Sequence, residues 1–401
     1  MYLKTLECKN YRSYPRLSLE FSPQGNVFCG ANAQGKTNIL EAVYLCSCAR
    51  SHRTGRDNEL IHQGEASYEV KINFVSDNGS EESIEIQYLD ESLLPSQRFP
   101  GAGKKVRKIY HNGLELGRIA DLFGLFHCVI FAPEDLMLVK EGPAGRRRFI
   151  DILISRLSPS YFKDLQLYQR ILQQRNKVLK RFRDSGQAFK HDAISKQMRQ
   201  VEMEVWNMQM AQCGARLIHR RQHFLERLKI HTAEAMDSLS NSKENYGQIY
   251  RCCSGVNAED SLEEIEKAYF QRLEATSEDD MQRGSSSQGP HRDDLELSLN
   301  DLPIKQYASQ GQQRSVVLAL KLAELNVIEE ECGERPVLLL DDVMSELDRH
   351  RRKYLMQSID EHQVIITCTD QNQVSSEGIV SPKLFLVHQS QVTVAERNEQ
   401  E

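Results

Sequence analysis

Hydrophobic and polar residues in the first 150 positions predict strands with a few helices, and two stretches alternate with the period of two that half-buried strands require. Residues 70–75 and 84–88 show this alternation clearly, and residues 106–110 run into Asn112-Gly113, a strong hairpin signal. Residues 27–29 form a short apolar run, which a helical stretch at 37–49 soon follows. We therefore predict a strand-rich region. The other strand candidates in it are residues 2–6, 17–21 and 128–131.

From residue 158 the period changes to that of a helix. Ser158-Pro159 supplies an N-cap and a first-turn proline, and a break follows at Ser185-Gly186. Apolar residues recur three, four or seven positions apart on both sides of this break, which predicts two helices packed against each other through these positions. The first would cover residues 160–183, about 35 Å at ~1.5 Å per residue. The apolar positions are Leu165, Tyr168, Leu172 and Leu179, then Ile194, Met198, Val201, Val205 and Met208.

Small and polar residues at 281–290 indicate a linker, after which an α/β pattern returns. It includes a helix at 310–331 and a buried strand at 337–340, which runs directly into acidic residues. We therefore predict an ATPase head built from residues 1–132 and 288–401, with a helical lobe, residues 133–287, inserted into it. The other strand candidates are residues 295–299, 364–367, 385–387 and 392–394.

The composition is that of a globular chain, with 40% apolar and 27% charged residues in a length of 401 that suits two or three domains. No apolar run is long enough to span a bilayer, and the N-terminus is polar from Lys4 onward. The ten cysteines show no paired CxxC spacing. We expect a cytoplasmic protein with reduced thiols and no membrane association.

The formal net charge of −6 conceals a segregation of charge. Residues 161–236 carry 15 basic and 7 acidic side chains, and residues 98–118 carry six basic side chains and one acidic one. Residues 259–280 are instead acidic, with nine acidic and two basic side chains. Such segregation can steer a polyanion to one face, although a solvated helix surface is the alternative. The candidates for contacts with DNA phosphates are Arg107, Lys108, Arg175, Lys177, Arg220 and Arg221.

Eight residues beginning at Gly30 match the phosphate-loop pattern GxxxxGK[ST] without deviation. Glycines let successive backbone N–H groups surround a phosphate, and the helix that follows adds the positive end of its dipole. We expect Lys36 to reach the β- and γ-phosphates of ATP and the Thr37 hydroxyl to coordinate Mg²⁺. The predicted ATP-binding residues of the loop are Gly30, Ala31, Asn32, Ala33, Gln34, Gly35, Lys36 and Thr37.

A second candidate is the acid pair Asp341-Asp342, at the end of the buried strand. A strand that ends in acid places a carboxylate at the carboxyl edge of its sheet, beside a phosphate loop. We expect Asp341 to hold Mg²⁺ and Asp342 to orient or deprotonate the attacking water. Many buried strands end in aspartate, so this prediction depends on the complete phosphate loop.

Ser309, Gly311 and Gln312 stand where another helix opens. Ser309 is either an ordinary N-cap, or its hydroxyl and the first N–H groups of the helix face a γ-phosphate. Arg12 and Arg53 are equally open. Each is either a surface residue or a group that approaches the phosphates, and Arg12 could also approach DNA.

The order of these motifs resembles an ABC-type ATPase head, and the stretch at 345–348 resembles its D-loop. The resemblance implies an α/β fold, a mixed sheet with a phosphate loop, that carries the inserted helical lobe. It also implies that the serine motif acts across a dimer on the ATP of a second head. Thr369 stands where transporter ATPases carry a switch histidine, so we count it with Lys36 and the acid pair among the expected catalytic residues.

Further stretches resemble the RecF family, in matching order to about residue 370. This resemblance implies a weak, DNA-stimulated ATPase that forms an ATP-dependent homodimer on double-stranded DNA at gaps or junctions, where slow hydrolysis acts as the release switch. It also implies cooperation with RecR and RecO in directing RecA onto gapped DNA. The stretches are residues 10–14 (NYRSY), 51–54 (SHRT), 131–136 (FAPEDL), 146–151 (RRRFID) and 289–294 (GPHRDD).

Two rival interpretations differ in what they require. The ATPase subunit of an ABC transporter needs a Q-loop glutamine and usually the switch histidine. No clear glutamine follows Phe131, and either Glu134 or Asp135 could take its place. A structural protein of the SMC type needs coiled coils of hundreds of residues, whereas the helical insertion has only about 75.

Overall fold

The computed structural model describes residues 1–94, 104–186, 193–370 and 382–395. Their contacts divide the chain into two units. We call Met1–Leu136, Glu234–Lys243 and Gln310–Glu401 the head unit, and Met137–Ala233 and Glu244–Ser309 the helical unit. Compared with the expected boundaries, residues 288–309 fall in the helical unit, and residues 133–136 and 234–243 fall in the head unit. Among the described helices, none combines the length and the apolar character needed to cross a bilayer.

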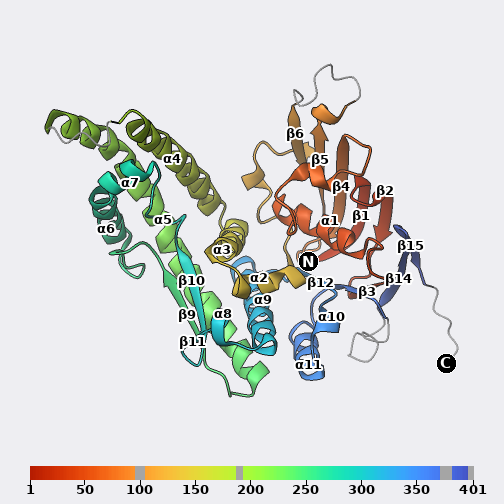
Figure 1. Ribbon diagram of the computed structural model, residues 1–401. Helices are drawn as coiled ribbons and strands as arrows, with labels where there is room; N and C mark the ends of the chain where they lie inside the picture. The colour runs from red at the N-terminus through yellow and green to blue at the C-terminus, as the bar shows by residue number, and fades with distance from the viewer. Residues whose placement is uncertain (95–103, 187–192, 371–381, 396–401) are drawn as a thin grey trace. The chain divides into compact units, whose positions relative to one another are not determined.

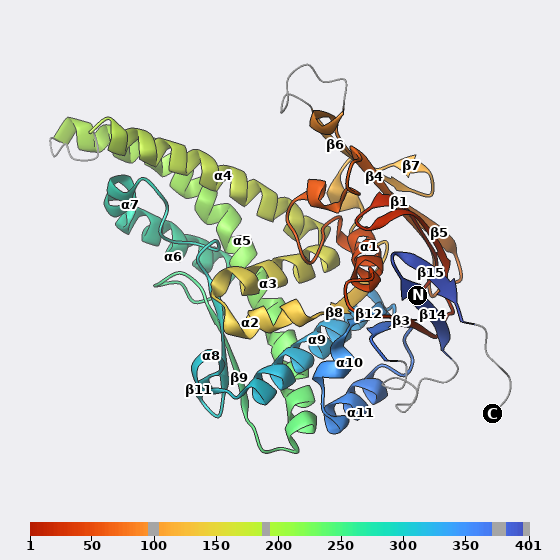
Figure 2. The ribbon, with the colours of Figure 1, turned by 45° about the vertical axis from the view of Figure 1, so that its right-hand side comes forward.

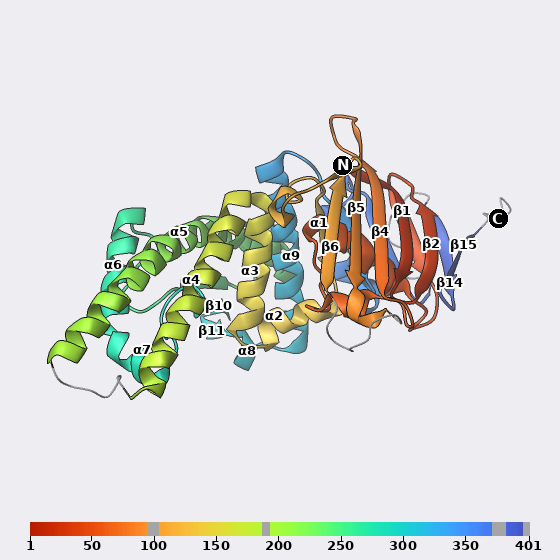
Figure 3. The same cartoon turned by 90° about the horizontal axis from the view of Figure 1, so that it is seen from above.

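The head unit contains two sheets, each six-stranded among the described residues (Figure 1). The first is antiparallel, in the order β2-β1-β4-β5-β6-β7, and Figure 3 shows most of its strands side by side. Its hairpin between β6 and β7 turns at Asn112 and Gly113, both at positive φ, as the sequence predicts. The strands are β1 (Tyr2–Tyr11), β2 (Tyr14–Glu20), β4 (Ser67–Val75), β5 (Glu81–Asp90), β6 (Lys105–His111) and β7 (Leu114–Glu115).

The second sheet is parallel except at β15, in the order β15-β14-β3-β13-β12-β8. Strands β8, β12 and β13 are buried along their whole length, so their sequences are almost entirely apolar. Because β13 lies between β3 and β12, it separates the strand before the phosphate loop from the strand that ends in the acid pair. The strands are β3 (Gly25–Cys29), β8 (Cys128–Phe131), β12 (Val337–Asp341), β13 (Val364–Cys368), β14 (Lys383–His388) and β15 (Gln391–Val394).

Helix α1 (Lys36–Cys48) lies between the two sheets and contacts strands of both. A helix in this position buries residues on every side, which explains why Ile39 to Cys48 are all buried. The head unit also contains α9 (Gln310–Cys332), α10 (Val343–Glu346), α11 (Arg349–Ser358) and the 3₁₀ turns η1 (Asp57–Leu60), η2 (Glu91–Leu93), η3 (Ile119–Asp121) and η4 (Pro133–Leu136).

The helical unit is organised around α4 (Pro159–Asp184) and α5 (Ala193–Ser240). The last turns of α5, from Glu234 onward, belong to the head unit. Ser158 caps α4 by accepting a hydrogen bond from the Tyr161 N–H, as predicted. Figure 2 shows α7 beside α4. The remaining elements are α2 (Met137–Lys140), α3 (Pro143–Leu157), α6 (Leu262–Ala275), α7 (Ser277–Arg283), α8 (Ile304–Tyr307), β9 (Tyr246–Arg251), β10 (Asp294–Leu299) and β11 (Leu302–Pro303).

The predicted packing face of the second helix is wrong. The side of α5 that packs inward carries Met203, which joins Leu179 and Phe182 of α4 and Met281 of α7 in one apolar cluster. Met203 is two positions, or about 200°, from the expected apolar stripe at ~100° per residue, so that stripe points away from the cluster. Its five side chains are 54–74% exposed: Ile194, Met198, Val201, Val205 and Met208.

The prediction of a linker at 281–290 is also wrong, because much of this segment is buried in the helical unit. Ser286 is 1% exposed, and its backbone N–H and hydroxyl both donate to Asn176 Oδ1, the side-chain amide oxygen, at 2.8 Å. A Cβ on Gly289 would lie 1.9 Å from the Tyr269 hydroxyl, and its φ of +124° favours glycine. Small, polar residues here allow close packing and buried hydrogen bonds, which composition alone does not distinguish from a linker.

Candidate nucleotide site

The phosphate loop lies between the carboxyl end of β3 and the first residue of α1. Two of its positions require glycine. A Cβ on Gly30 would lie 2.3 Å from the Val387 carbonyl oxygen, and one on Gly35 would lie 2.9 Å from Ser13 Oγ and 2.8 Å from the Tyr14 hydroxyl. Gly35 also has a φ of +106°. A side chain at either position would clash with these neighbours, so glycine permits the tight turn in which the loop N–H groups can surround an anion.

Lys36 lies across this loop. Its Nζ donates to the Ala31 carbonyl oxygen at 2.9 Å and also to the Gly30 carbonyl oxygen. An ammonium is a compact charge with three donors, so it can replace a carbonyl partner by a phosphate oxygen. The structure thus places the predicted lysine at the loop, with a positive charge where phosphates would bind.

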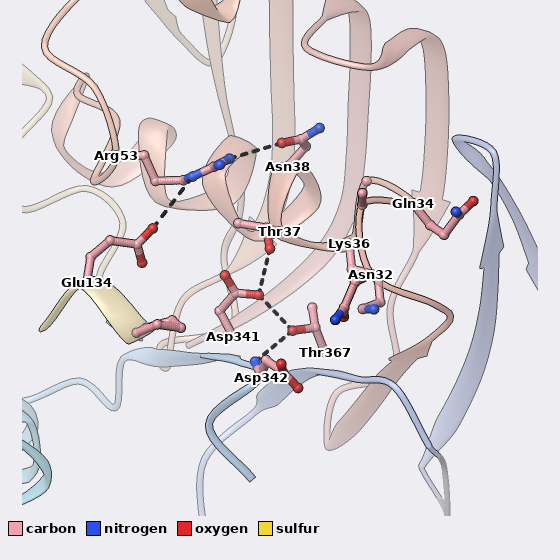
Figure 4. Close-up of a pocket in the computed structure, with 13 residues that line it drawn as sticks. Asn32, Gln34, Lys36, Thr37, Asn38, Arg53, Glu134, Asp341, Asp342 and Thr367 are labelled. Carbon is pink, nitrogen blue, oxygen red and sulfur yellow. Dashed lines mark hydrogen bonds and ion pairs between the residues drawn. The ribbon is translucent and has the colours of Figure 1, made fainter. Parts of the chain in front are cut away.

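A chain of hydrogen bonds joins the phosphate loop to the acid pair (Figure 4). Thr37 Oγ1 donates to Asp341 Oδ1 at 2.9 Å, and Thr367 Oγ1 donates to the same oxygen at 2.8 Å. Thr367 Oγ1 in turn accepts from the Asp342 backbone N–H at 2.9 Å. Burial raises the pKa of Asp341, although both threonine hydroxyls act in the opposite direction. The oxygens of Thr37 and Asp341 are the hard ligands that Mg²⁺ prefers, so these residues fit the expected cation.

Thr367 is a residue that the sequence reasoning missed. It lies on β13, the strand between β3 and β12, in register with Asp341. Its side chain is fully buried. The available signal is one hydroxyl in an otherwise apolar buried strand. Thr369 is exposed beyond the end of β13 and does not line the cavity described below.

Asp342 has an unusual local geometry. Its φ is +51°, a left-handed conformation that is uncommon for a residue other than glycine. Its Oδ1 is buried, and among the described residues it has no hydrogen-bond partner. A carboxylate oxygen in that state is available to a water or ligand group.

These groups line one cavity of about 330 Å³ in the head unit. Of the two Q-loop candidates, Glu134 lines the cavity and Asp135 does not. Asp135 Oδ2 instead accepts from the Ala132 backbone N–H at 2.8 Å, and burial raises the pKa of Asp135 to about 6. Arg53 also lines the cavity, with Nη1 3.3 Å from Asn38 Oδ1 and Nε 3.8 Å from a Glu134 oxygen.

The serine motif contributes nothing to this lining. Ser309 is exposed where α9 begins, and Gly311 and Gln312 are half-buried in its first turn. The cavity therefore contains the phosphate loop and the acid pair of the chain without its serine motif.

Two of the six predicted DNA contacts need correction. Arg175 is fully buried and donates to Asp280 Oδ2 at 2.8 Å, and Arg221 is 2% exposed and pairs with Asp151 at 2.8 Å and Asp293 at 3.1 Å. A guanidinium that is buried and paired inside its own unit is not presented to a phosphate. Counting charge along the sequence does not distinguish such residues from surface ones.

The other four predicted DNA contacts reach the surface to different degrees. Lys177 is exposed on α4. The Arg220 side chain is 32% exposed and lies 3.3 Å from Asp164. Lys108 is 47% exposed, whereas Arg107 is only 18% exposed and pairs with an aspartate of η1.

The head unit has a mostly parallel sheet with a phosphate loop after β3 and an acid pair at the end of β12, two strands away. This arrangement defines a phosphate-loop ATPase of the ABC-head class. Comparison with known proteins specifies the family. The family model for the RecF/RecN/SMC N terminal domain matches residues 2–393. The chain is 42% identical to the DNA replication and repair protein RecF of Ruminiclostridium cellulolyticum, over 92% of this chain and 93% of that one. It is 40% identical to RecF of Alkaliphilus oremlandii, over 98% of this chain and 100% of that one.

Solved structures agree with this assignment. A structure described as the recombination mediator protein RecF-ATP in the RecFOR pathway has a TM-score of 0.85 and 34% identity, covering 98% of both chains. The Smc head domain of Pyrococcus furiosus, at 18% identity and a TM-score of 0.53, shares the fold alone. The chain belongs to the RecF family, and the rival prediction of a transporter subunit is set aside.

Proposed function

We propose that this protein is an ATP-dependent DNA-binding ATPase of recombinational repair and replication restart. Its relatives are named DNA replication and repair proteins, and a solved relative is described as RecF with ATP. The observation that carries the proposal is the hydrogen-bonded chain from Thr37 through Asp341 and Thr367 to Asp342, beside the phosphate loop. It gathers a cation site and a free carboxylate oxygen in one cavity.

The phosphate loop, the cation ligands and the second acid have separate proposed roles. The N–H groups of the loop and Lys36 bind the β- and γ-phosphates of ATP. Thr37 and Asp341 hold Mg²⁺, which neutralises phosphate charge when bound. Asp342 orients or deprotonates the attacking water through its unpartnered oxygen. The Asp342 carboxylate is one methylene shorter than a glutamate, so we expect slow hydrolysis.

The site is proposed to be completed by a second copy of the chain. Ser309, Gly311 and Gln312 lie outside the cavity lining at the exposed start of α9, where a helix N-terminus can meet a phosphate. ATP then joins two heads, and its γ-phosphate is the contact that favours the closed dimer. Hydrolysis removes this contact, which limits the time the dimer spends on DNA.

DNA is proposed to bind through exposed basic side chains rather than buried ones. Lys163, Arg170 and Lys177 are exposed and seven residues apart on α4, so they share one face of the helix. Lys108, which is exposed, and Arg220, which is partly exposed, are the other candidates. Contacts of this kind bind phosphates without sequence preference and weaken steeply with salt. We further propose that the dimer acts at gaps or junctions with RecR and RecO to direct RecA, and that DNA stimulates its weak ATPase.

Sedimentation of the protein with ATP, Mg²⁺ and duplex DNA tests this function. Lys36→Ala should lose ATP binding and DNA retention, because a charge-assisted contact contributes about 1.5–3 kcal/mol. Ser309→Arg should leave ATP binding by the monomer intact and abolish ATP-dependent dimerisation. Asp342→Asn should instead trap the closed dimer.

Three results would contradict the proposal. Normal ATP affinity in Lys36→Ala removes the nucleotide assignment. Dimerisation of Ser309→Arg with ATP, or dissociation of Asp342→Asn as fast as the unmodified protein, removes the two-copy site.

A further inference from the structure

Glu41 is a buried carboxylate on α1, five residues beyond Lys36, and it lies outside the cavity lining. Its side chain is 0% exposed. Arg12 donates to both carboxylate oxygens, from Nε at 2.8 Å and from Nη2 at 2.7 Å. The Ser51 hydroxyl donates to Oε1 at 2.5 Å, and Arg53 Nη1 lies 3.6 Å from Oε2. Two guanidinium groups and one hydroxyl therefore share a single carboxylate.

Burial alone raises the pKa of Glu41, but hydrogen bonds from Arg12 and Ser51 and the nearby charges outweigh it, so the pKa is lowered. Glu41 is accordingly ionised at neutral pH. A buried ionised carboxylate is expensive unless it is paired and hydrogen-bonded, and this one has both kinds of partner.

The partners of Glu41 are themselves fixed by other segments. Arg12, in the turn between β1 and β2, has a left-handed φ of +50° and donates from Nη1 to the Glu59 carbonyl oxygen at 2.7 Å. The Ser51 hydroxyl accepts from the backbone N–H groups of Arg53 and Thr54 at 3.0 and 3.1 Å. Since that hydroxyl donates to Glu41, it links the carboxylate directly to the backbone of Arg53.

Arg53 connects this cluster to the nucleotide cavity. Figure 4 shows its guanidinium near Asn38 and Glu134, on the Thr37 and Asp341 side of the cavity. Thr37 and Asp341 would hold Mg²⁺, which neutralises phosphate charge, and Arg53 lies on their side of the cavity, where a guanidinium can contact the terminal phosphate. Its contact with Glu41 is long, at 3.6 Å, whereas Arg12 holds the same carboxylate at two points.

We propose that Glu41 is a positioning residue for recognition of the γ-phosphate, acting through Arg53. Arg12 neutralises Glu41 permanently. Ser51 fixes the Arg53 backbone and the carboxylate lies 3.6 Å from the Arg53 guanidinium, which therefore keeps a charge to offer to a phosphate. This inference rests on the proposed function and deepens it. It predicts that Glu41 controls the preference for ATP over ADP, although Glu41 does not touch the nucleotide.

Equilibrium binding of ATP and ADP with Mg²⁺ tests the role of Glu41. Glu41→Gln keeps the shape but removes the charge, so we expect the Kd for ATP to rise about tenfold and the Kd for ADP to change less than twofold. Arg53→Ala should reduce the same ratio, and adding Glu41→Gln to it should change the ratio less than twofold further, because both act through one guanidinium. Glu41→Asp should restore part of the preference. Glu81→Gln is the matched control, because Glu81 forms an exposed pair with Lys4 in the same unit.

A merely structural carboxylate gives a different pattern. ATP and ADP affinity would then fall together, the effects of Glu41→Gln and Arg53→Ala would add, and the inference would be overturned. Unchanged ATP preference in a folded Glu41→Gln also overturns it. If circular dichroism shows that Glu41→Gln does not fold, Ser51→Ala replaces it, with an expected loss of about threefold in ATP preference, and an unchanged preference overturns the inference. Failure of the proposed function is distinct, since the unmodified protein would then not bind ATP.

Discussion

The buried ion pair between Arg175 and Asp280 gives the sharpest test of the corrected role of Arg175. Both side chains are 0% exposed. Asp280 Oδ2 accepts from Arg175 Nη1 at 2.8 Å, and Oδ1 accepts from the Ser287 N–H at 3.0 Å. Asp280→Asn keeps the size of the side chain and an acceptor oxygen, but it removes the charge opposite the guanidinium.

The expected cost follows from what remains buried. Arg175 keeps its hydrogen bonds to Asn207 at 3.0 Å and Ser286 at 2.6 Å, but neither partner carries a charge. Removing one partner of a buried pair typically costs about 3–5 kcal/mol, because the other charge is left uncompensated. A loss of this size should lower the melting temperature by roughly 6–20 °C, at about 2–4 °C per kcal/mol for a unit of this size.

Urea unfolding followed by tryptophan fluorescence measures this cost. Trp206 is the one tryptophan of the sequence and lies on α5, next to Asn207, so its emission reports on the helical unit. The matched control is Glu296→Gln, which removes the partner of Arg251 in a pair whose side chains are more than half exposed. It should cost less than about 1 kcal/mol.

The double variant Arg175→Met with Asp280→Asn separates structure from DNA binding. Removing both charges should give a protein more stable than Asp280→Asn alone. It should also bind DNA with an unchanged salt dependence, because no phosphate contact is lost. The reasoning is refuted if Asp280→Asn costs no more than Glu296→Gln. It is equally refuted if the folded double variant loses about one unit of salt slope.

Two further predictions concern the catalytic chain and pH. Thr367→Val should slow ATP hydrolysis at least tenfold with little change in ATP affinity, because it removes the hydroxyl that joins Asp341 to Asp342. Thr367→Ser keeps the hydroxyl and should retain activity. Equal rates of phosphate release by the two variants would contradict this prediction. Burial lowers the pKa of His52 and of His291 to about 4. Below the ordinary histidine pKa near 6.5, the unfolded chain therefore binds more protons than the folded chain. The free energy of unfolding should fall as the pH drops from 6.5 towards 4, by roughly 3 kcal/mol for each histidine. Urea midpoints from pH 7.5 to 4.5 check this, and His52→Phe should flatten the decline, so an identical decline in that variant opposes it.

The sequence by itself determined the features that are encoded locally. The phosphate loop is eight contiguous residues, so the sequence predicts both the turn at its glycines and the chemistry of Lys36 and Thr37. Strand and helix periods predicted α1, α4 and the hairpin at Asn112-Gly113, because each depends on near neighbours in the chain. The ordered set of short motifs identified the family.

Only the tertiary structure decided which side chains meet. Thr367 joins the acid pair because β13 lies between β3 and β12. Glu41 contacts Arg12 and Ser51 because the turn between β1 and β2 and the segment after α1 both lie against α1. Neither partnership leaves a pattern in the sequence, since the residues are 10 to 29 positions apart and have different types.

The same limit explains the two errors on the helices. On α4, Arg175 and Lys177 are two positions apart, so they point in nearly opposite directions, one to a buried aspartate and the other to solvent. On α5, the apolar stripe from Ile194 to Met208 has a helical period, but Met203 on the other side faces the cluster. Period and charge specify that a helix has distinct faces. Which face is buried depends on the partner elements, whose positions the local sequence does not contain.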